Sequence, residues 1–188
     1  MKYSKLAMLN FMALCCVLGI FTKKMINPFA NIITEALHIP GGVSTAFSIM
    51  FLVIASEVVR FSSTEFTERD KRYLGTLMGT VQGFLALALG RVGSMGIFMP
   101  LGFMMTGIAI DLVYEAGCLF KFEAKERMIF ANVAAAFTAS FFANLIVFSL
   151  PIQVLGLYLC VSCISGIIFG FLGYTIKQKI LCGLLQKE

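Results

Sequence analysis

The sequence has few charged residues and a single histidine, and it lacks the motifs of several enzyme classes. Charged residues make up 13% of the chain, whereas soluble domains carry about 25%. No Walker A glycine-lysine loop is present, so this chain does not hydrolyse ATP by that route. His38, the one histidine, excludes the His-Glu-x-x-His site of a metalloprotease. Because "RVGSMG" also departs from the Gly-x-Ser-x-Gly elbow of serine hydrolases, we expect no enzymatic activity.

The six cysteines do not form the pattern of a disulfide framework. Four of them, Cys15, Cys16, Cys160 and Cys163, lie in apolar runs, where cysteine behaves as a small hydrophobic residue. The stretch "CVSC" has the spacing of half a zinc site, but no second pair accompanies it, so no metal site is expected. No signal-peptide cleavage motif follows the first apolar run, which we therefore expect to remain as a membrane span.

Long apolar runs separated by clusters of charge predict a polytopic helical membrane protein embedded in a lipid bilayer. Hydrophobic residues make up 59% of the chain, and a helix of ~20 residues crosses a hydrocarbon core of ~30 Å. No linker divides the chain, so residues 1–188 are expected to form a single integral membrane domain, an all-α bundle of six transmembrane helices. The predicted spans are Leu6–Phe21, Val43–Val59, Tyr73–Leu89, Gly96–Tyr114, Met128–Leu150 and Ile152–Ile176.

The positive charges predict the orientation of the bundle, because short cytoplasmic loops are rich in Lys and Arg. Twelve of the fifteen lie in the N-terminus, the second and fourth loops and the C-terminus, and three, Lys23, Lys24 and Arg91, lie in the remaining loops. Both termini are therefore expected on the cytoplasmic side. This topology accounts for the net charge of +5, so no nucleic-acid partner is expected.

The first outer loop contains the only histidine. The apolar residues of "NPFANIITEAL" follow helical spacing after Pro28, which predicts a short amphipathic helix at the outer surface. The stretch "HIPGG" would end this helix and turn the chain into the next span. Two interpretations remain open: a lid that carries Glu35 and His38 above the mouth of the bundle, or an interfacial cap whose polar groups are solvated.

Polar residues also concentrate in the outer halves of the predicted spans and in the outer loops, with Gln82 at mid-membrane on the third span. A small-molecule pocket combines apolar walls with a few hydrogen-bonding groups. Each residue alone is more readily explained by a hydrogen bond between helices, but the bias toward one end favours a site. A cationic ligand would require Glu35, the one carboxylate in the set. The candidate substrate-binding residues are Asn31, Glu35, His38, Gln82, Arg91, Ser94, Met95, Asn144, Gln153 and Tyr158.

Three carboxylates, Glu57, Asp111 and Glu115, fall near the cytoplasmic ends of spans, close to Arg60 and the basic loops. Ionisable groups are costly in lipid. They are explained either by salt bridges at the rim with snorkelling side chains or by a docking surface for a cytoplasmic partner. No carboxylate falls at mid-membrane, which disfavours an ion-coupled transporter.

Small residues recur every four positions in three of the spans, so they share one face of each helix. Such stripes let helix backbones approach closely within lipid. We expect packing within the chain, with docking of a partner membrane protein as the alternative. The stripes are Gly75, Gly79 and Gly83; Ala131, Ala135, Ala139 and Ala143; and Ser162, Gly166 and Gly170.

The pattern "NPFANIITEALHIPGG…FLVIASEVV", the glycine-rich third span and "GRVGSMGIFMPLGFMMTGIAIDLVY" resemble the substrate-binding S components of energy-coupling factor (ECF) transporters. The resemblance covers roughly residues 5–175 and is nearest to the thiamine and hydroxymethylpyrimidine branch. It implies a protein of the bacterial plasma membrane that captures a vitamin or related micronutrient outside the cell. It also implies release through a transmembrane coupling protein and two ATPase subunits, which hydrolyse the ATP.

The resemblance further implies a docking face for the coupling protein on the first span, where the family carries Ala-x-x-x-Ala. Here Ala7 is followed four positions later by Phe11, and the remaining small pair is Cys15 and Gly19. A stand-alone facilitator or secondary transporter remains an alternative, although inverted repeats are not evident. A haem-like or other cofactor-like cargo also remains open.

Overall fold

The computed structural model describes residues 5–36, 38, 42–62, 66–90 and 93–185, and in this part of the chain every regular element is helical. The all-α prediction is therefore confirmed for these residues. The elements are α1 Lys5–Ala36, α2 Val43–Ser62, α3 Glu68–Arg72, α4 Leu74–Ala88, the 3-10 helix η1 Gly93–Phe98, α5 Met99–Leu119, α6 Ala124–Ala143, the π-helix η2 Asn144–Phe148, and α7 Ile152–Leu185.

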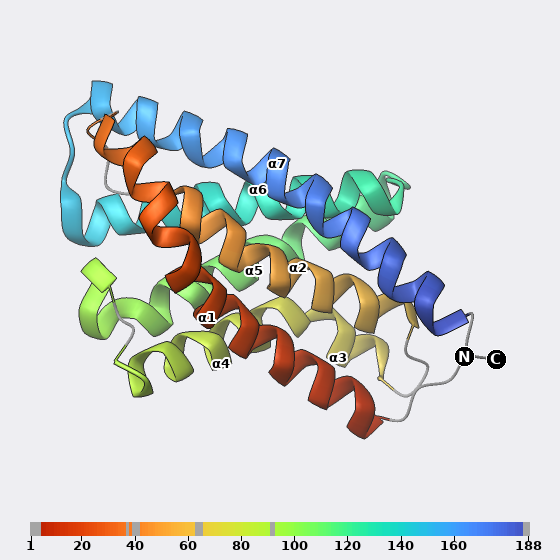
Figure 1. The fold of residues 1–188 in the computed structure, drawn as a ribbon. Helices are drawn as coiled ribbons and strands as arrows, with labels where there is room; N and C mark the ends of the chain where they lie inside the picture. Colours follow the sequence, from red (N-terminus) through yellow and green to blue (C-terminus); the bar gives the residue numbers. More distant parts are fainter. Residues whose placement is uncertain (1–4, 37, 39–41, 63–65, 91–92, 186–188) are drawn as a thin grey trace.

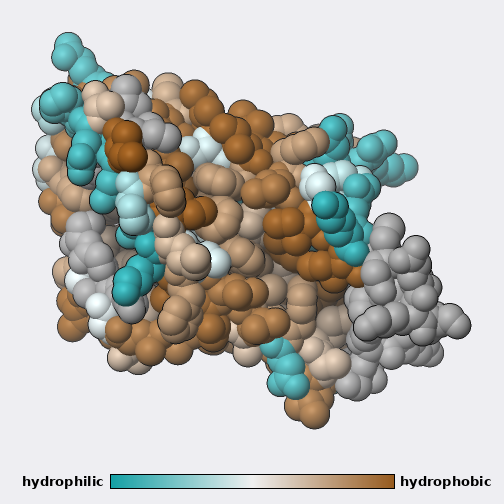
Figure 2. Space-filling view, viewed as in Figure 1, coloured by the Kyte–Doolittle hydropathy of each residue, from teal (hydrophilic) through white to brown (hydrophobic). Residues whose placement is uncertain are grey.

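Five of the helical segments are long and apolar enough to cross a membrane, namely α1, α2, α5, α6 and α7. The remaining predicted span, the third (Tyr73–Leu89), corresponds to α4, whose 15 residues extend over about 22 Å at ~1.5 Å per residue, less than a hydrocarbon core of ~30 Å. Figure 2 shows a hydrophobic surface across the middle of the visible face, with hydrophilic residues toward its two ends. By length and composition, the chain has the architecture of a multi-pass membrane protein.

The centre of the bundle is α2, which contacts α1, α4, α6 and α7. Its side chains from Leu52 to Val59 are all buried. The other main contacts join helices that are neighbours in sequence, α4 with α5, α5 with α6, and α6 with α7. The beginning of α1 and the end of α7 lie at the same end of the bundle (Figure 1).

The first helix differs from the prediction. The span Leu6–Phe21 and the amphipathic segment after it form one helix, α1, with Pro28 inside it. A separate outer-loop helix was the wrong prediction, because no residue between Phe21 and Pro28 interrupts the helix. Proline removes one main-chain donor and crowds the preceding turn, which bends a helix without necessarily ending it. Accordingly, α1 changes direction along its length (Figure 1).

Other boundaries shift by a few residues. The fourth membrane-spanning stretch begins at Met95, one residue before the predicted Gly96. Its α-helix, α5, begins at Met99, because Gly96 adopts a positive φ of 53° within η1. The fifth begins earlier, at Ala124, where Glu123 and Glu126 form a capping box that satisfies the first amide groups of α6. Its last residues, Asn144–Phe148, wind as a π-helix.

Helices α4 and α5 pack through glycines at backbone distance. A Cβ atom at Gly79 would lie 2.3 Å from the carbonyl oxygen of Phe103, and one at Gly107 would lie 2.2 Å from that of Gly75. Real Cβ atoms do not approach a carbonyl so closely, so any larger residue would force the helices apart. The glycine stripe of the third span therefore serves packing within the chain, as predicted.

The α6–α7 interface uses the Ser162, Gly166 and Gly170 stripe of α7, while Ala131 and Ala135 of the α6 stripe are buried in the core. A Cβ atom at Gly166 or Gly170 would lie 2.8 Å from the Cα atom of Val133 or Ile129, respectively. Asn132 adds a hydrogen bond across the interface, from its Nδ2 to the carbonyl oxygen of Gly166 at 2.9 Å. Close approach of backbones and interhelical hydrogen bonds are what hold helices together where lipid supplies no hydrophobic drive.

A buried ionic cluster ties the helices together at the end of the bundle where α1 begins, here called the ionic end. The Glu57 side chain on α2 is 0% exposed, and its Oε1 atom accepts from Arg127 of α6 at 3.1 Å and from Lys177 of α7 at 2.9 Å. Arg127 also donates to the carbonyl oxygen of Phe122 at 2.6 Å and lies over the Phe61 ring. One carboxylate thus joins three helices.

Asp111 forms a second buried ion pair at the ionic end. It pairs with Arg60 of α2 and accepts the amide groups of Gly75 and Thr76, each at 2.8 Å. These amides belong to the first turn of α4, where main-chain donors lack partners within the helix. Asp111 on α5 therefore caps α4 and binds α2 at the same time.

These contacts refine the prediction for the carboxylates. Glu57 and Asp111 form salt bridges, but they are buried between helices and do not snorkel from the rim. Glu115 alone matches the rim arrangement, since its pair with Arg72 at 2.8 Å is half exposed. A docking surface would need accessible charges, which the two buried carboxylates do not provide.

The α4–α5 contact predicts that Gly79→Ala destabilises the bundle by about 1–3 kcal/mol, the usual cost of overpacking. Gly156→Ala is the matched control, because a Cβ atom there would meet nothing within 4 Å. Both changes add the same helix propensity, so the difference between their midpoints of thermal unfolding in detergent isolates the clash. Equal midpoints would contradict the close contact.

The ionic cluster predicts that Glu57→Gln costs about 3–5 kcal/mol, because it leaves Arg127 and Lys177 as buried charges without a counter-charge. The matched control is Glu115→Gln, which removes an exposed carboxylate at the same end and should cost less than about 1 kcal/mol. Denaturant unfolding in micelles, followed by circular dichroism, measures both. A similar loss of unfolding free energy in the two variants would contradict the role of the buried ion pairs of Glu57.

Candidate binding site at the irregular end

The opposite end of the bundle, here called the irregular end, gathers non-standard backbone. It contains η1, η2 and five of the six described residues with positive φ: His38, Gly42, Gly90, Gly96 and Ser149. Non-helical backbone near membrane depth needs partners from protein or from a water-lined cavity. Single π-turns occur frequently at functional sites. The two ends of the bundle therefore differ in kind.

Gln82 belongs to a buried polar group that joins three helices. Its Nε2 atom donates to the hydroxyl of Ser48 on α2 at 3.1 Å, and Ser48 donates in turn to the carbonyl oxygen of Gly19 on α1 at 2.7 Å. Gln82 is 0% exposed, and its Oε1 atom has no partner among the described residues. A buried amide oxygen without a donor is costly, so this atom can accept a further hydrogen bond.

Tyr158 belongs to a second polar group, between α6, α7 and the start of α2. The Ser140 and Ser162 hydroxyls lie 2.5 Å apart, and Ser162 donates to the carbonyl oxygen of Tyr158 at 2.9 Å. A Cβ atom at Gly42 would lie 2.8 Å from the Ser162 hydroxyl and 3.3 Å from the Tyr158 ring. Gly42, with φ 111°, therefore lets the start of α2 pack directly on this group.

Asn144 has a structural partner. Its Oδ1 atom accepts the amide of Leu150 at 2.8 Å, and its carbonyl oxygen accepts the amide of Ser149 at 2.9 Å. These bonds end the π-helix and turn the chain into α7. Asn144 thus shapes the irregular end, and its side-chain oxygen is already used.

The remaining predicted site residues do not converge into one closed cavity in the described contacts. Asn31, Glu35, His38 and Gln153 are exposed. His38 donates its amide to the carbonyl oxygen of Glu35 at 3.2 Å, in the left-handed conformation common just after a helix. Met95 is half-buried, and its sulfur lies 2.9 Å from where a Gly102 Cβ would be. Ser94 lies in η1, and Arg91 lies outside the described residues.

The predicted docking residues differ in their exposure. Ala7 is exposed on α1. Cys15 is 4% exposed, and Gly19 lies against Ser48 and Gln82, so both face the interior of the bundle and offer no surface to a partner.

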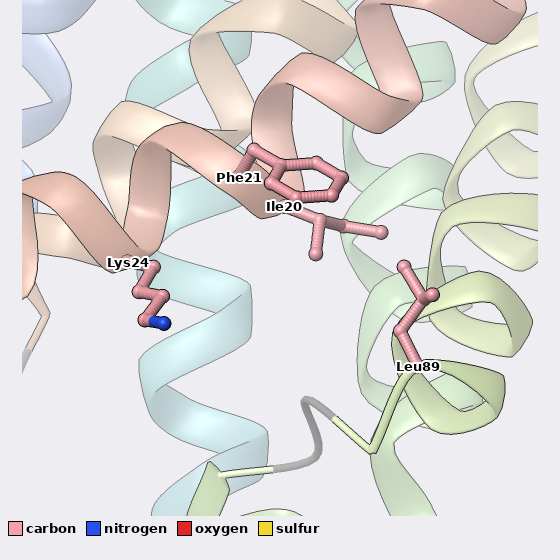
Figure 3. A pocket seen from close by; sticks show the side chains of 4 residues that line it. All are labelled: Ile20, Phe21, Lys24 and Leu89. Atoms are coloured by element: carbon pink, nitrogen blue, oxygen red, sulfur yellow. The ribbon is translucent and has the colours of Figure 1, made fainter.

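A small pocket lies between α1 and the end of α4, lined by Ile20, Phe21, Lys24 and Leu89 (Figure 3). Its volume is about 70 Å³, whereas sites for drug-sized ligands occupy about 300–1,000 Å³. None of the predicted site residues lines it. This pocket therefore has neither the size nor the polar groups expected for a vitamin.

Sequence reasoning missed Ser48 and Ser140, which supply the hydrogen bonds of the two polar groups. Ser48 was detectable as a lone hydroxyl in the apolar stretch "AFSIMFL". In contrast, its pairing with Gln82 joins residues 34 positions apart, and no local pattern encodes that distance.

The chain matches no protein-family model, and neither curated proteins nor solved structures give a match. Any function assigned to it rests on its own residues and their arrangement.

The Gln82 group predicts an asymmetry between its members. Gln82→Met should change stability by less than about 1 kcal/mol, because it removes an amide whose oxygen is unpaired while Ser48 keeps its bond to Gly19. Ser48→Ala should cost about 1–2 kcal/mol, since it removes both interhelical bonds. Unfolding midpoints in detergent test the order, and a larger loss for Gln82→Met would contradict this account.

Proposed function

We propose that this chain is the substrate-binding S component of an ECF-type transporter, which captures a small micronutrient at the irregular end. The observation that carries the proposal is the contrast between the two ends. Buried ion pairs close the ionic end, whereas the irregular end combines unusual backbone turns with two buried polar groups. A binding protein that opens to one side requires such a difference.

The distribution of charge supports the orientation. The basic loops that follow α2 and α5 lie at the ionic end (Figure 1), and positive loops face the cytoplasm in most membrane proteins. The irregular end would then face outward, as capture from outside requires. The proposed location is the plasma membrane of a bacterium.

The proposed division of labour rests on the resemblance, which implies that a transmembrane coupling protein and two ATPase subunits supply the energy. This chain carries no Walker A loop, so transport by this chain alone would be downhill. Of the three small residues considered for docking, Ala7 alone remains exposed. The docking face on α1 would therefore consist mainly of its bulky apolar residues.

The proposed ligand is thiamine or its pyrimidine precursor. Gln82 supplies an unpaired acceptor for a ligand amine that reaches it when the irregular end opens. Glu35, exposed near the end of α1, supplies the negative charge that attracts a cation. Neutral hydroxymethylpyrimidine shares the ring but lacks the thiazolium charge.

The purified chain should bind thiamine or hydroxymethylpyrimidine saturably, with one site per chain. Liposomes that contain this chain alone should not accumulate either compound. Titration calorimetry measures binding, and radiolabelled uptake measures transport. Accumulation by the chain alone would favour a facilitator. Absence of binding, with no small molecule found by mass spectrometry in the purified protein, would refute the proposal.

Two variants separate the ligand contacts from general damage. Glu35→Gln should weaken the binding of thiamine about fivefold, because an exposed ion pair contributes about 1 kcal/mol. The affinity for hydroxymethylpyrimidine should stay unchanged. Glu115→Gln, which removes an exposed carboxylate at the ionic end, is the control and should affect neither ligand. Equal losses for both ligands would remove the electrostatic role of Glu35.

A further inference from the structure

The pocket between α1 and α4 opens sideways, toward the surroundings of the bundle. Two of its lining residues, Phe21 and Leu89, are 54% and 46% exposed. Lys24 lies at the edge of the same pocket, with its side chain beside the apolar wall (Figure 3). The pocket is thus an apolar groove that has one cation at its rim, and we call it the α1–α4 groove.

The groove exists because α4 is short. This helix ends at Ala88 after 15 residues, whereas α1 continues to Ala36. Beyond Leu89 the chain turns at Gly90, which has φ 65°. A Cβ atom built at Gly90 would have no neighbouring atom within 4 Å. A helix shorter than the hydrocarbon thickness leaves a space that the bilayer must fill.

The rim of the groove lies about one hydrocarbon thickness from Lys5 along α1. Lys24 follows Lys5 by nineteen residues, which corresponds to about 28 Å along a helix and matches a hydrocarbon core of ~30 Å. If Lys5 marks one interface, Lys24 marks the other. No ion pair within the described part of the chain involves Lys24.

We propose that the α1–α4 groove binds an anionic phospholipid from the leaflet opposite Lys5. One acyl chain packs on Ile20, Phe21 and Leu89, and the phosphate lies at the Lys24 ammonium group. Charge complementarity selects an anionic headgroup, because a lysine near an anionic membrane surface contributes about 1 kcal/mol of attraction. The apolar wall selects a lipid over a free phosphate.

Native mass spectrometry of the full chain in micelles tests the proposal with phosphatidylglycerol and phosphatidylcholine of identical acyl chains. The wild type should retain phosphatidylglycerol preferentially. Lys24→Gln should lower that retention about fivefold, to the level of phosphatidylcholine, since one lysine near an anionic surface contributes a factor of about five. Lys24→Arg should preserve the preference.

Matched controls locate the effect. Lys121→Gln removes one exposed charge at the ionic end and should leave retention unchanged. Leu89→Trp fills the groove and should reduce retention of both lipids, whereas Leu112→Trp, at an exposed leucine outside the groove, should not. Equal retention of the two lipids by the wild type would overturn the proposal. So would equal losses in Lys24→Gln and Lys121→Gln, or displacement of phosphatidylglycerol by equimolar glycerol 3-phosphate.

Discussion

Pairing of buried charge at one end of the bundle is the constraint on which the rest of the structure depends. Glu57 is fully enclosed and holds cations from α6 and α7, and Asp111 joins α2, α4 and α5. A lone buried charge in this setting would cost several kcal/mol. The five helices must therefore keep one mutual arrangement at this end.

That constraint allows the opposite end to be irregular. The helix pairs stay in contact along the length of the bundle. Glycines bring the backbone of α4 close to that of α5, and the backbone of α7 close to that of α6. The π-helix and five of the six described residues with positive φ lie at that end, away from the ion pairs of Glu57 and Asp111. This contrast between the two ends is the observation on which the proposed capture function rests.

The short α4 links the same packing to the bilayer. Gly75, Gly79 and Gly83 hold this helix tightly on α5, but its few turns leave a groove beside α1. Because α4 ends at Ala88, the chain turns at Gly90 and leaves room for the proposed lipid site with Lys24 at its rim.

The sequence by itself determined the helical class, the approximate spans and the packing role of the small residues, because apolar length and four-residue spacing are local properties. It did not reveal that α1 continues through Pro28, since a proline bends or ends a helix according to its neighbours. Only the tertiary structure decided that Glu57 and Asp111 are buried rather than at the rim, and that Gln82 pairs with Ser48 while Tyr158 lies with Ser140 and Ser162. Gln82 and Ser48 lie 34 positions apart and Ser140 and Ser162 lie 22 apart, so their meeting depends on how whole helices pack.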